Sequence, residues 1–222
     1  MEESNINGII KSELSEAIKN NLKGNNLLGL DVGFGTGILS YQLVHLHNFS
    51  KIVGVESEKR NHLTNEKYRS HSNFRQSVEG NPVLSKYVVE EFDSYRKIIF
   101  FQFYQKYVEE ELGKTPLNEG GFEEVFDSNF QFGTEVKNYS WSNNYDMIIL
   151  SRVLHYMEKE EQIDVLKKAV ENLNKKGVLF IVNRLNTEKS IDLTAVINMF
   201  NLKRVKEDLY KEKHVIHVLV KL

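Results

Sequence analysis

The sequence predicts an α/β fold built on a doubly wound, mostly parallel β-sheet. Short apolar segments rich in β-branched residues alternate along the chain with segments of helical, amphipathic spacing. A glycine-rich turn, DVGFGTG at 31–37, joins the first apolar segment to the helical pattern after it. Two closely spaced strand patterns end the chain and predict a hairpin. Strands that alternate with helices are typical of a parallel sheet covered by helices.

The first part of the pattern contains two strands, each followed by a helix. Residues 8–23 carry apolar side chains at helical spacing and predict a short amphipathic helix. LLGLDVG at 27–33 is then a buried strand, and GILSYQLVHLH at 37–47 is helical. KIVGVES at 51–57 is a second β-branched run, and the polar SEKRNHLTNEKY at 57–68 is compatible with a helix.

The second part continues the alternation. YDMIILS at 145–151 and KGVLFIVN at 176–183 are two apolar strands. Between them an amphipathic helix is predicted on the spacing of Ile163, Leu166, Ala169, Val170 and Leu173. A helix and then a strand follow in 192–209. The alternating HVIHVLVKL at 214–222 closes the chain, so we expect this last strand to lie antiparallel to its neighbours.

Residues 68–121 interrupt the alternation and predict a helical insertion within a single domain of residues 1–222. Two adjoining helical stripes run along it, one formed by Ile98, Phe101, Tyr104, Val108 and Leu112 and the other by Ile99, Phe103 and Tyr107. An apolar face this wide requires burial. The sequence leaves three roles open: packing on the main core, packing on a second subunit in a homodimer, and a lid over a substrate.

Composition and charge exclude several classes of protein. With 41% hydrophobic and 27% charged residues, the 222-residue chain is typical of a soluble globular domain. Its 29 basic and 31 acidic residues are mixed along the chain, which argues against a nucleic-acid partner. No apolar run is long enough to span a bilayer and the acidic start MEESNINGII lacks an export signal, so we expect a cytoplasmic protein.

No metal site is expected. The chain has no cysteine, which excludes thiolate ligands and cysteine nucleophiles. His214 and His217 lie three apart on a predicted strand and face opposite sides. His45 and His47 lie two apart on a predicted helix and diverge.

The glycine turn and Glu56 predict an adenosyl ligand. The turn lies where a strand ends and a helix begins, so its backbone amides face the carboxyl edge of the sheet. Its pattern is an acid followed by G-x-G-x-G, and the dinucleotide spacing fails because Ile38 stands three residues after Gly35. Glu56 ends the second strand, where a carboxylate accepts hydrogen bonds from both ribose hydroxyls and repels a 2′-phosphate.

LDVGFGTG, VGVES and YDMIILSRVLHYM resemble the first, second and fourth-strand motifs of Rossmann-like S-adenosylmethionine-dependent methyltransferases. The nearest resemblance is to the small-molecule group that includes the ubiquinone and menaquinone biosynthesis enzymes, and it covers the chain except 68–121. It implies a Rossmann-like, doubly wound, mostly parallel sheet of seven strands with an antiparallel last strand. It also implies S-adenosylmethionine as the cofactor.

Site residues follow from this resemblance. The glycines would line the methionine and ribose parts of the cofactor, Asp31 would steady the loop and the amino group, and Glu56 would take the ribose. For the adenine the candidates are Thr134 and Glu135, although the family's usual aspartate is absent at Thr134 and Asp127 is a rival. The implied cofactor-binding set is Asp31, Gly33, Phe34, Gly35, Thr36, Gly37, Glu56, Thr134, Glu135 and Ser151.

Candidates for the chemistry follow the fourth strand, in SRVLHYM. A sulfonium is already a good leaving group, so the protein has to hold a nucleophile in line with the methyl and exclude water. His155 is the ready general base, although its place at the start of a helix favours a structural role. Arg152 would hold an acidic substrate, and Tyr156 stands at the same edge.

The expected function is transfer of a methyl group to a small-molecule acceptor by in-line displacement. Phe100, Phe103, Tyr104 and Tyr107 would favour an aromatic or apolar acceptor. The Asn/Asp-Pro-Pro-Tyr/Phe motif of amino-group methylation is replaced by SRVL at 151–154, which argues against nucleobase and glutamine targets. The alternatives are a protein or RNA methyltransferase and a non-catalytic partner subunit that binds the cofactor.

Overall fold

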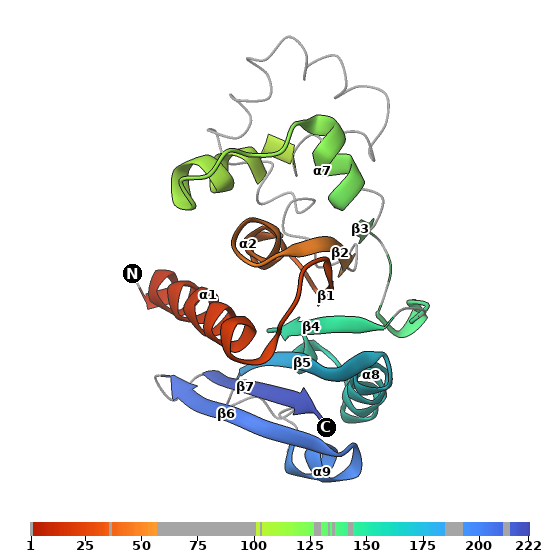
Figure 1. Cartoon of the computed structure of the whole chain (residues 1–222). Helices are drawn as coiled ribbons and strands as arrows, with labels where there is room; N and C mark the ends of the chain where they lie inside the picture. The colour runs from red at the N-terminus through yellow and green to blue at the C-terminus, as the bar shows by residue number, and fades with distance from the viewer. Residues whose placement is uncertain are drawn as a thin grey trace.

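The strands form one seven-stranded sheet. The computed structural model describes residues 2–35, 37–56, 101–102, 104–126, 130–132, 134, 136–141, 144–184, 193–210 and 214–222. The strands in these ranges are β1 (Leu27–Val32), β2 (Phe49–Glu56), β3 (Phe130–Phe132), β4 (Tyr145–Ser151), β5 (Leu173–Arg184), β6 (Leu202–Tyr210) and β7 (His214–Lys221). Their order across the sheet is β3-β2-β1-β4-β5-β7-β6 (Figure 1).

The sheet is parallel except at β7. Strand β1 pairs in parallel with β2 and β4, β2 with β3, and β4 with β5. Strand β7 runs antiparallel to both β5 and β6. The predicted Rossmann-like, mostly parallel sheet with an antiparallel last strand is therefore confirmed. The strand order reverses between β1 and β4, and crevices at such switch points are where open α/β sheets bind ligands.

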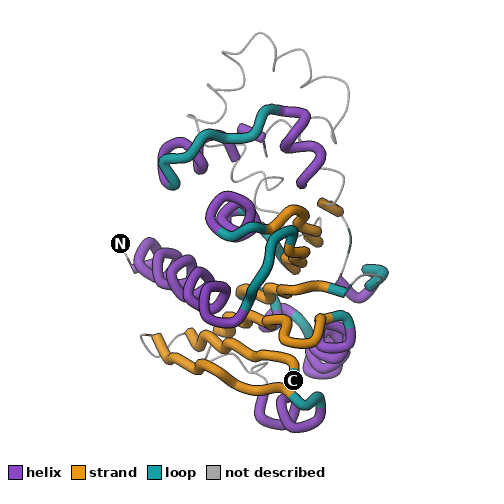
Figure 2. Tube along the Cα trace, in the orientation of Figure 1, coloured by secondary structure: helices purple, strands orange, loops and turns teal. Residues whose placement is uncertain are grey.

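Helices cover both faces of the sheet (Figures 1 and 2). The α-helices within the described ranges are α1 (Glu2–Asn21), α2 (Ile38–Leu46), α7 (Glu119–Val125), α8 (Lys159–Glu171) and α9 (Leu193–Met199). Each face has its own hydrophobic cluster, and β4 supplies both because successive side chains of a strand point to opposite faces. Met147 and Ile149 pack on the side of α1 and α2, whereas Ile148 and Leu150 pack on the side of α8 and α9. This explains why β4 reads as an uninterrupted apolar run.

Two helix predictions need correction in detail. Helix α1 begins at Glu2 and ends at Asn21, so it starts earlier than the periodicity at 8–23 predicts. On α8 the predicted apolar position Ile163 is wrong, because its side chain is 44% exposed. Gln162 is buried in its place, and its Nε2 donates a hydrogen bond of 3.1 Å to the Met157 carbonyl. The predicted helix at 57–68 lies outside the described residues.

The described part of the insertion packs on the main core. Helical residues 101–102 and 104–106 lead into a π-helical turn, η2 (Tyr107–Glu111). Tyr104 is fully buried, with its ring 5.2 Å from that of Tyr41 on α2 and 4.9 Å from that of Phe122 on α7. Core packing is therefore the role of this part. The substrate-facing role expected of Tyr104 is wrong, since full burial leaves no surface for a ligand; Phe100 and Phe103 lie outside the described residues.

The Tyr104 hydroxyl holds this segment in place. It accepts a hydrogen bond of 2.6 Å from the Leu117 backbone N–H and is hydrogen-bonded to His45 Nε2 at 2.7 Å. Tyr104→Phe leaves the partly buried Leu117 N–H without this acceptor and His45 without its partner, so we expect the free energy of unfolding to fall by about 1–3 kcal/mol in urea denaturation. Tyr107→Phe is the matched control: its hydroxyl has no hydrogen-bond partner among the described residues, and a change under about 0.5 kcal/mol is expected. Equal losses in both variants would contradict this assignment.

Within the described ranges, no helix combines the length and the apolar character that crossing a bilayer requires.

Candidate functional site

The predicted site residues that the structure describes gather at the carboxyl edge of the sheet, where β1, β2 and β4 end side by side. Val32 at the end of β1 is in register with Val55 of β2 and Leu150 of β4. The Gly33 N–H continues the ladder by donating to the Val55 carbonyl at 2.7 Å. Three segments far apart in sequence therefore leave the sheet at one place, beside the switch point between β1 and β4.

The three positions of the turn require glycine for different reasons. A Cβ on Gly33 would lie 2.9 Å from Cγ2 of Val153, in the segment that follows β4. A Cβ on Gly37 would lie 2.7 Å from the ring of Tyr41. At Gly35 no atom of the described residues lies within 4 Å of the corresponding position, and its φ of 57° is in the left-handed region that favours glycine. Gly33 and Gly37 are thus required by packing, while Gly35 faces open space.

Glu56 and the turn are joined directly. The Gly35 N–H donates a hydrogen bond of 2.8 Å to Oε2 of Glu56, whose side chain is buried at the end of β2. Glu56 ends β2, as predicted, and this hydrogen bond brings it beside the glycine turn. The carboxylate positions the loop at Gly35, which is also the residue whose surroundings are open.

Asp31 is the second buried carboxylate of this edge. It lies on β1, is 2% exposed, and its Oδ2 accepts a hydrogen bond of 2.8 Å from the hydroxyl of Ser40 on α2. Burial raises the pKa of Asp31 from its ordinary value of 3.8 to about 7; the Ser40 hydrogen bond lowers it, and the neighbouring Glu56 charge raises it further. A cation placed here would relieve the charge repulsion between Asp31 and Glu56.

The remaining members of the glycine turn differ in what they offer to a ligand. The Phe34 side chain is buried in the hydrophobic cluster on the side of α1 and α2, so its ring is not presented at the edge. The Phe34 carbonyl accepts a hydrogen bond of 2.9 Å from the Gly37 N–H. Thr36 lies outside the described residues.

The segment after β4 turns sharply over the same edge. Ser151 ends β4, and Arg152 adopts a φ of 56°, unusual for a residue other than glycine. The Arg152 N–H donates to the Val182 carbonyl at 2.8 Å, which anchors this turn to β5. Strained backbone of this kind clusters at ligand-binding and active sites.

His155 and Tyr156 stand on a short 3-10 turn, η5 (Leu154–Tyr156). Their ring centroids are 4.0 Å apart at an interplanar angle of 39°. Tyr156 is 47% exposed, whereas Leu154 beside it is buried in the core. The turn therefore presents the tyrosine ring to the surface next to a partly buried histidine.

The adenine candidates are only partly described. Strand β3 ends at Phe132, and Thr134 follows shortly after it, partly buried. Thr134 therefore lies beyond the carboxyl end of β3, where the resemblance requires the adenine residue. Glu135 and the rival Asp127 lie outside the described residues.

Sequence reasoning missed two residues that shape this edge. Ser40, fully buried, binds Asp31, and Val153 occupies the space that Gly33 leaves. A small hydroxyl within the mostly apolar predicted helix ILSYQLV was a signal for Ser40. No sequence pattern marks Val153, because its contact with Gly33 depends on how the chain turns at Arg152.

The hydrogen-bonding groups and charges at this edge of the sheet indicate which kind of ligand it could bind. Two buried carboxylates, Asp31 and Glu56, accept hydrogen bonds from hydroxyl and ammonium groups and favour positive charge. Open space at Gly35 admits a ligand against the backbone. A cationic ligand with vicinal hydroxyls fits this set, whereas a phosphate would be repelled.

Comparisons with known proteins identify the fold. Neither a protein-family model nor a curated protein matches the sequence. The structure is similar to that of N-methyltransferase NodS from Bradyrhizobium japonicum WM9, with a TM-score of 0.55 and 11% identity over 100% of this chain and 99% of that chain. It is also similar to magnesium protoporphyrin IX methyltransferase ChlM from Synechocystis PCC 6803, solved with bound SAM, with a TM-score of 0.55 and 12% identity over 97% and 79% of the two chains.

A third similar structure is a TehB-like SAM-dependent methyltransferase from Corynebacterium glutamicum ATCC 13032. Its TM-score is 0.52, with 10% identity over 96% of this chain and 88% of that chain. The three proteins share little sequence with this chain, yet each is matched over most of both lengths. The chain therefore has the Rossmann-like fold of these methyltransferases.

Proposed function

We propose that this protein is a methyltransferase that uses S-adenosylmethionine and acts on a small-molecule acceptor. The observation that carries the proposal is the hydrogen bond between the Gly35 N–H and Glu56, which joins an open glycine loop to a buried carboxylate at the switch point. Lone glycine loops are weak signals, because tight turns also need glycine. A carboxylate fixed at the end of the second strand is a second observation, independent of the glycine loop, that supports an adenosyl site.

The residues present fit the cofactor. Glu56 would accept the ribose hydroxyls, and Asp31 would face the amino group as a buried counter-charge. Space at Gly35 would admit the ligand, and Thr134 with Glu135 would hold the adenine. The similarity in fold to ChlM, which was solved with bound SAM, supports this assignment.

When bound, S-adenosylmethionine supplies a sulfonium methyl group that is already activated for displacement. The chain's own task is to hold the acceptor in line and to exclude water. The post-β4 segment is suited to it, because Ser151, Arg152, His155 and Tyr156 leave the sheet at the same edge as the glycine loop. His155 would take a proton only from an acceptor that arrives protonated, and Arg152 would hold an acidic one.

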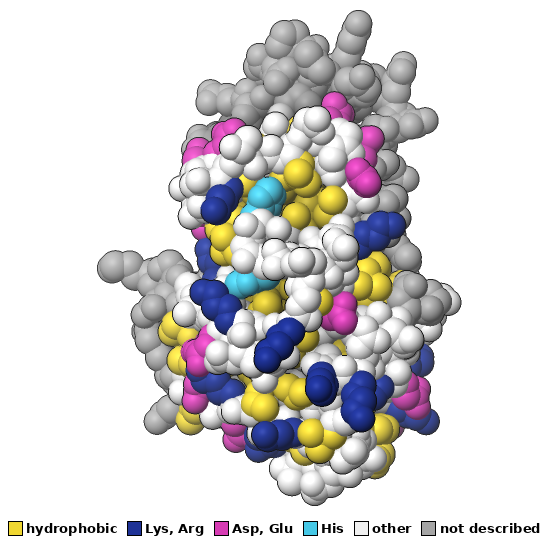
Figure 3. Space-filling view, viewed as in Figure 1, with side chains coloured by type: hydrophobic (Ala, Val, Ile, Leu, Met, Phe, Trp, Pro, Cys, Tyr) yellow, Lys and Arg dark blue, Asp and Glu magenta, His cyan; other side chains and the backbone are white. Residues whose placement is uncertain are grey.

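Charge distribution and fold similarity support a small-molecule acceptor. On the face shown in Figure 3, basic side chains are interspersed with acidic, apolar and uncharged ones, unlike the continuous basic stripe of a nucleic-acid surface. ChlM is a magnesium protoporphyrin IX methyltransferase, which is a precedent for such an acceptor on this fold. The lid role of the insertion at 68–121 and a homodimer stay predictions.

Glu56 is the residue to test first. Calorimetric titration of the wild type with S-adenosylmethionine, S-adenosylhomocysteine and NAD should show binding of the first two alone. In Glu56→Ala, loss of the ribose acceptor should weaken S-adenosylmethionine binding at least tenfold, or roughly 1.4 kcal/mol. The affinity of Glu56→Gln for S-adenosylmethionine should lie between those of the wild type and Glu56→Ala, because the glutamine amide oxygen still accepts a hydrogen bond from the Gly35 N–H.

Two outcomes would refute the proposal. One is a well-folded wild type that binds neither S-adenosyl compound. The other is Glu56→Ala with unchanged affinity, which would remove Glu56 from the ligand site. Circular dichroism of each variant establishes that the fold is intact before affinities are compared.

A further inference from the structure

Exposed lysines gather at the amino edge of the sheet, which is the edge opposite the glycine loop. The parallel strands begin at this edge, β6 also begins there, and β7 ends there because it runs antiparallel to both neighbours. Neighbouring strands lie about 4.8 Å apart, so this edge is roughly 25 Å long from β2 to β6. Six exposed lysines form what we term the lysine edge: Lys19 and Lys23 around the end of α1, Lys51 on β2, Lys175 and Lys176 on β5, and Lys203 on β6.

The rest of the chain leaves the charge of the lysine edge unbalanced. Within the described ranges, none of the six lysines forms an ion pair. Two acidic side chains at the same edge have other partners. Asp146 Oδ1 accepts a hydrogen bond of 2.8 Å from Asn174 Nδ2, and Glu171 Oε1 lies 4.0 Å from Lys167 Nζ. The lysine edge therefore presents positive charge to the surroundings of the protein.

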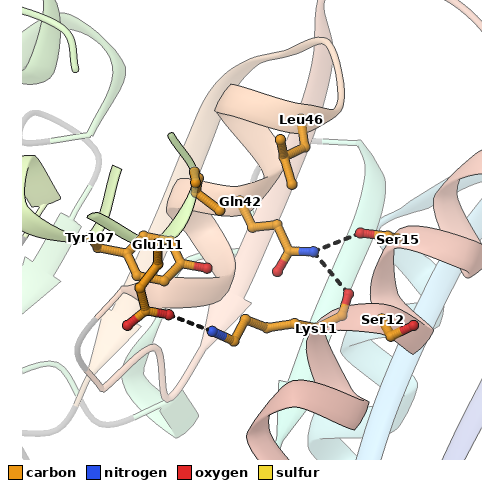
Figure 4. Close-up of a pocket in the computed structure, with 8 residues that line it drawn as sticks. Lys11, Ser12, Ser15, Gln42, Leu46, Tyr107 and Glu111 are labelled. Atoms are coloured by element: carbon orange, nitrogen blue, oxygen red, sulfur yellow. Dashed lines mark hydrogen bonds and ion pairs between the residues drawn. The ribbon is translucent and has the colours of Figure 1, made fainter. Parts of the chain in front are cut away.

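The described part of the insertion carries the opposite charge. Six exposed glutamates form what we term the glutamate surface: Glu109, Glu110 and Glu111 on η2, and Glu119, Glu123 and Glu124 on α7. Two of them are paired within the chain, because Glu111 Oε2 lies 2.8 Å from Lys11 Nζ (Figure 4) and Glu110 Oε2 lies 4.0 Å from Lys106 Nζ. The other four form no ion pair within the described ranges. Lys106 and Lys114 are the basic residues of 104–126, so acidic charge predominates there.

Charges of opposite sign occupy different parts of one face of the molecule. Figure 3 shows dark blue basic side chains across the lower half of this face, separated by uncharged ones, and magenta acidic side chains along its upper rim. Helix α7 lies at that upper end in Figure 1, which has the same orientation. The whole chain has a formal charge of only -2, so the field at this face comes from the separation of charges.

We propose that two copies of this chain form a symmetric dimer in which the lysine edge of each copy contacts the glutamate surface of the other. A two-fold axis through a face with charges separated in this way brings opposite charges together twice, and such closed dimers are the commonest oligomers. A second copy is the partner that fits because the complementary acidic surface belongs to the chain itself. The carboxyl edge stays open in this arrangement, and the proposal does not depend on the methyltransferase function proposed above.

The dimer should be weak and sensitive to salt. Exposed ion pairs each contribute little and are screened by dissolved ions, so the association depends on several of them acting together. In sedimentation equilibrium at about 100 μM protein and about 20 mM sodium chloride, we expect a mass approaching twice the 25.9 kDa of one chain. At about 500 mM salt the screening length falls from roughly 20 Å to about 4 Å, and the dissociation constant should rise more than tenfold.

Charge reversal on either surface tests which groups meet. Lys23→Glu with Lys175→Glu should weaken the dimer at least about tenfold at low salt, and Glu123→Lys with Glu124→Lys should do the same. Lysines are favourable near the C-terminus of a helix, so α7 should tolerate the second pair. An equimolar mixture of the two double variants should dimerise more tightly than either alone, because the heterodimer regains one native contact. Circular dichroism establishes that each variant is folded.

A matched control reverses two exposed basic residues at the other edge of the sheet. Lys159 begins α8 and Arg184 ends β5, both beyond the carboxyl ends of the strands. Lys159→Glu with Arg184→Glu changes the net charge by the same amount as the lysine-edge variant and should leave the dimer intact.

Four results would overturn the proposal. They are a wild type that stays monomeric at low salt, a dimer that is unaffected by salt, an equal loss in the control variant, and a mixture that is no heavier than its two components. Sedimentation of a monomeric wild type with vesicles that contain phosphatidylserine would assign the lysine edge to an anionic membrane instead.

Discussion

Gly35→Val is expected to abolish binding of S-adenosylmethionine while the protein still folds. None of the described residues lies within 4 Å of the added Cβ, so that atom meets no neighbour among them in the ligand-free protein. The branched side chain instead fills the space against the loop that the cofactor would occupy. A loss of more than about 100-fold in affinity, or over 2.7 kcal/mol, should be seen by calorimetry.

The chain offers a matched control for this variant. Gly113 has a φ of 60°, close to the 57° of Gly35, and here too no described residue lies within 4 Å of an added Cβ. Gly113→Val therefore places a valine in the same strained conformation, at the end of η2 and away from the loop. Equal affinity losses in both variants would attribute the effect to backbone strain, and an unchanged affinity in Gly35→Val would show that no ligand lies above the loop.

Sequence patterns predicted the sheet well because its strands depend on local information. Strand β4 begins and ends at the predicted residues, because an apolar run bounded by polar residues can be recognised without information on tertiary contacts. Glu56 could be placed beside the glycine turn because parallel strands end at one edge of a sheet. The hairpin of β6 and β7 followed from the short connection alone.

The errors arise where packing depends on distant parts of the chain. Helical periodicity put Ile163 inside, but Gln162 is buried because the turn before α8 offers it the Met157 carbonyl. Tyr104 was expected to face a substrate, yet its hydroxyl finds partners in His45 and Leu117 and its ring fills the core. A polar group's partner cannot be read from spacing when the partner belongs to another element.

Asp31 should make the free energy of unfolding of the ligand-free protein fall as the pH rises, and replacing its carboxylate should remove this dependence. Its pKa of about 7 lies above the ordinary 3.8, so the folded state holds the proton more tightly than the unfolded state does. Stability from this group is fully present below pH 3.8 and is lost as pH rises to about 7. Asp31→Asn should therefore raise the free energy of unfolding above pH 7 relative to the wild type, with little gain near pH 4, in urea denaturation at the two pH values.

The same carboxylate should make cofactor binding depend on pH. An ammonium group prefers ionised Asp31, so binding releases the proton that a pKa of about 7 retains in the ligand-free protein. Affinity for S-adenosylmethionine should fall by up to roughly tenfold per pH unit below pH 7, with about half a proton released per ligand at pH 7. Calorimetry in two buffers of different ionisation enthalpy counts that proton.

Two variants separate Asp31 from other titrating groups. Asp31→Asn removes the counter-charge and should weaken binding about 100-fold while flattening its pH dependence. Ser40→Ala removes the hydrogen bond that lowers the pKa of Asp31, so the fall in affinity should begin at a higher pH. Binding that is independent of pH in the wild type, or a pH dependence that persists in Asp31→Asn, would show that the ligand's cation lies elsewhere. The opposite effects expected of Asp31→Asn, a more stable protein that binds less well, would mark a carboxylate kept in the core at a cost to folding because the ligand needs it.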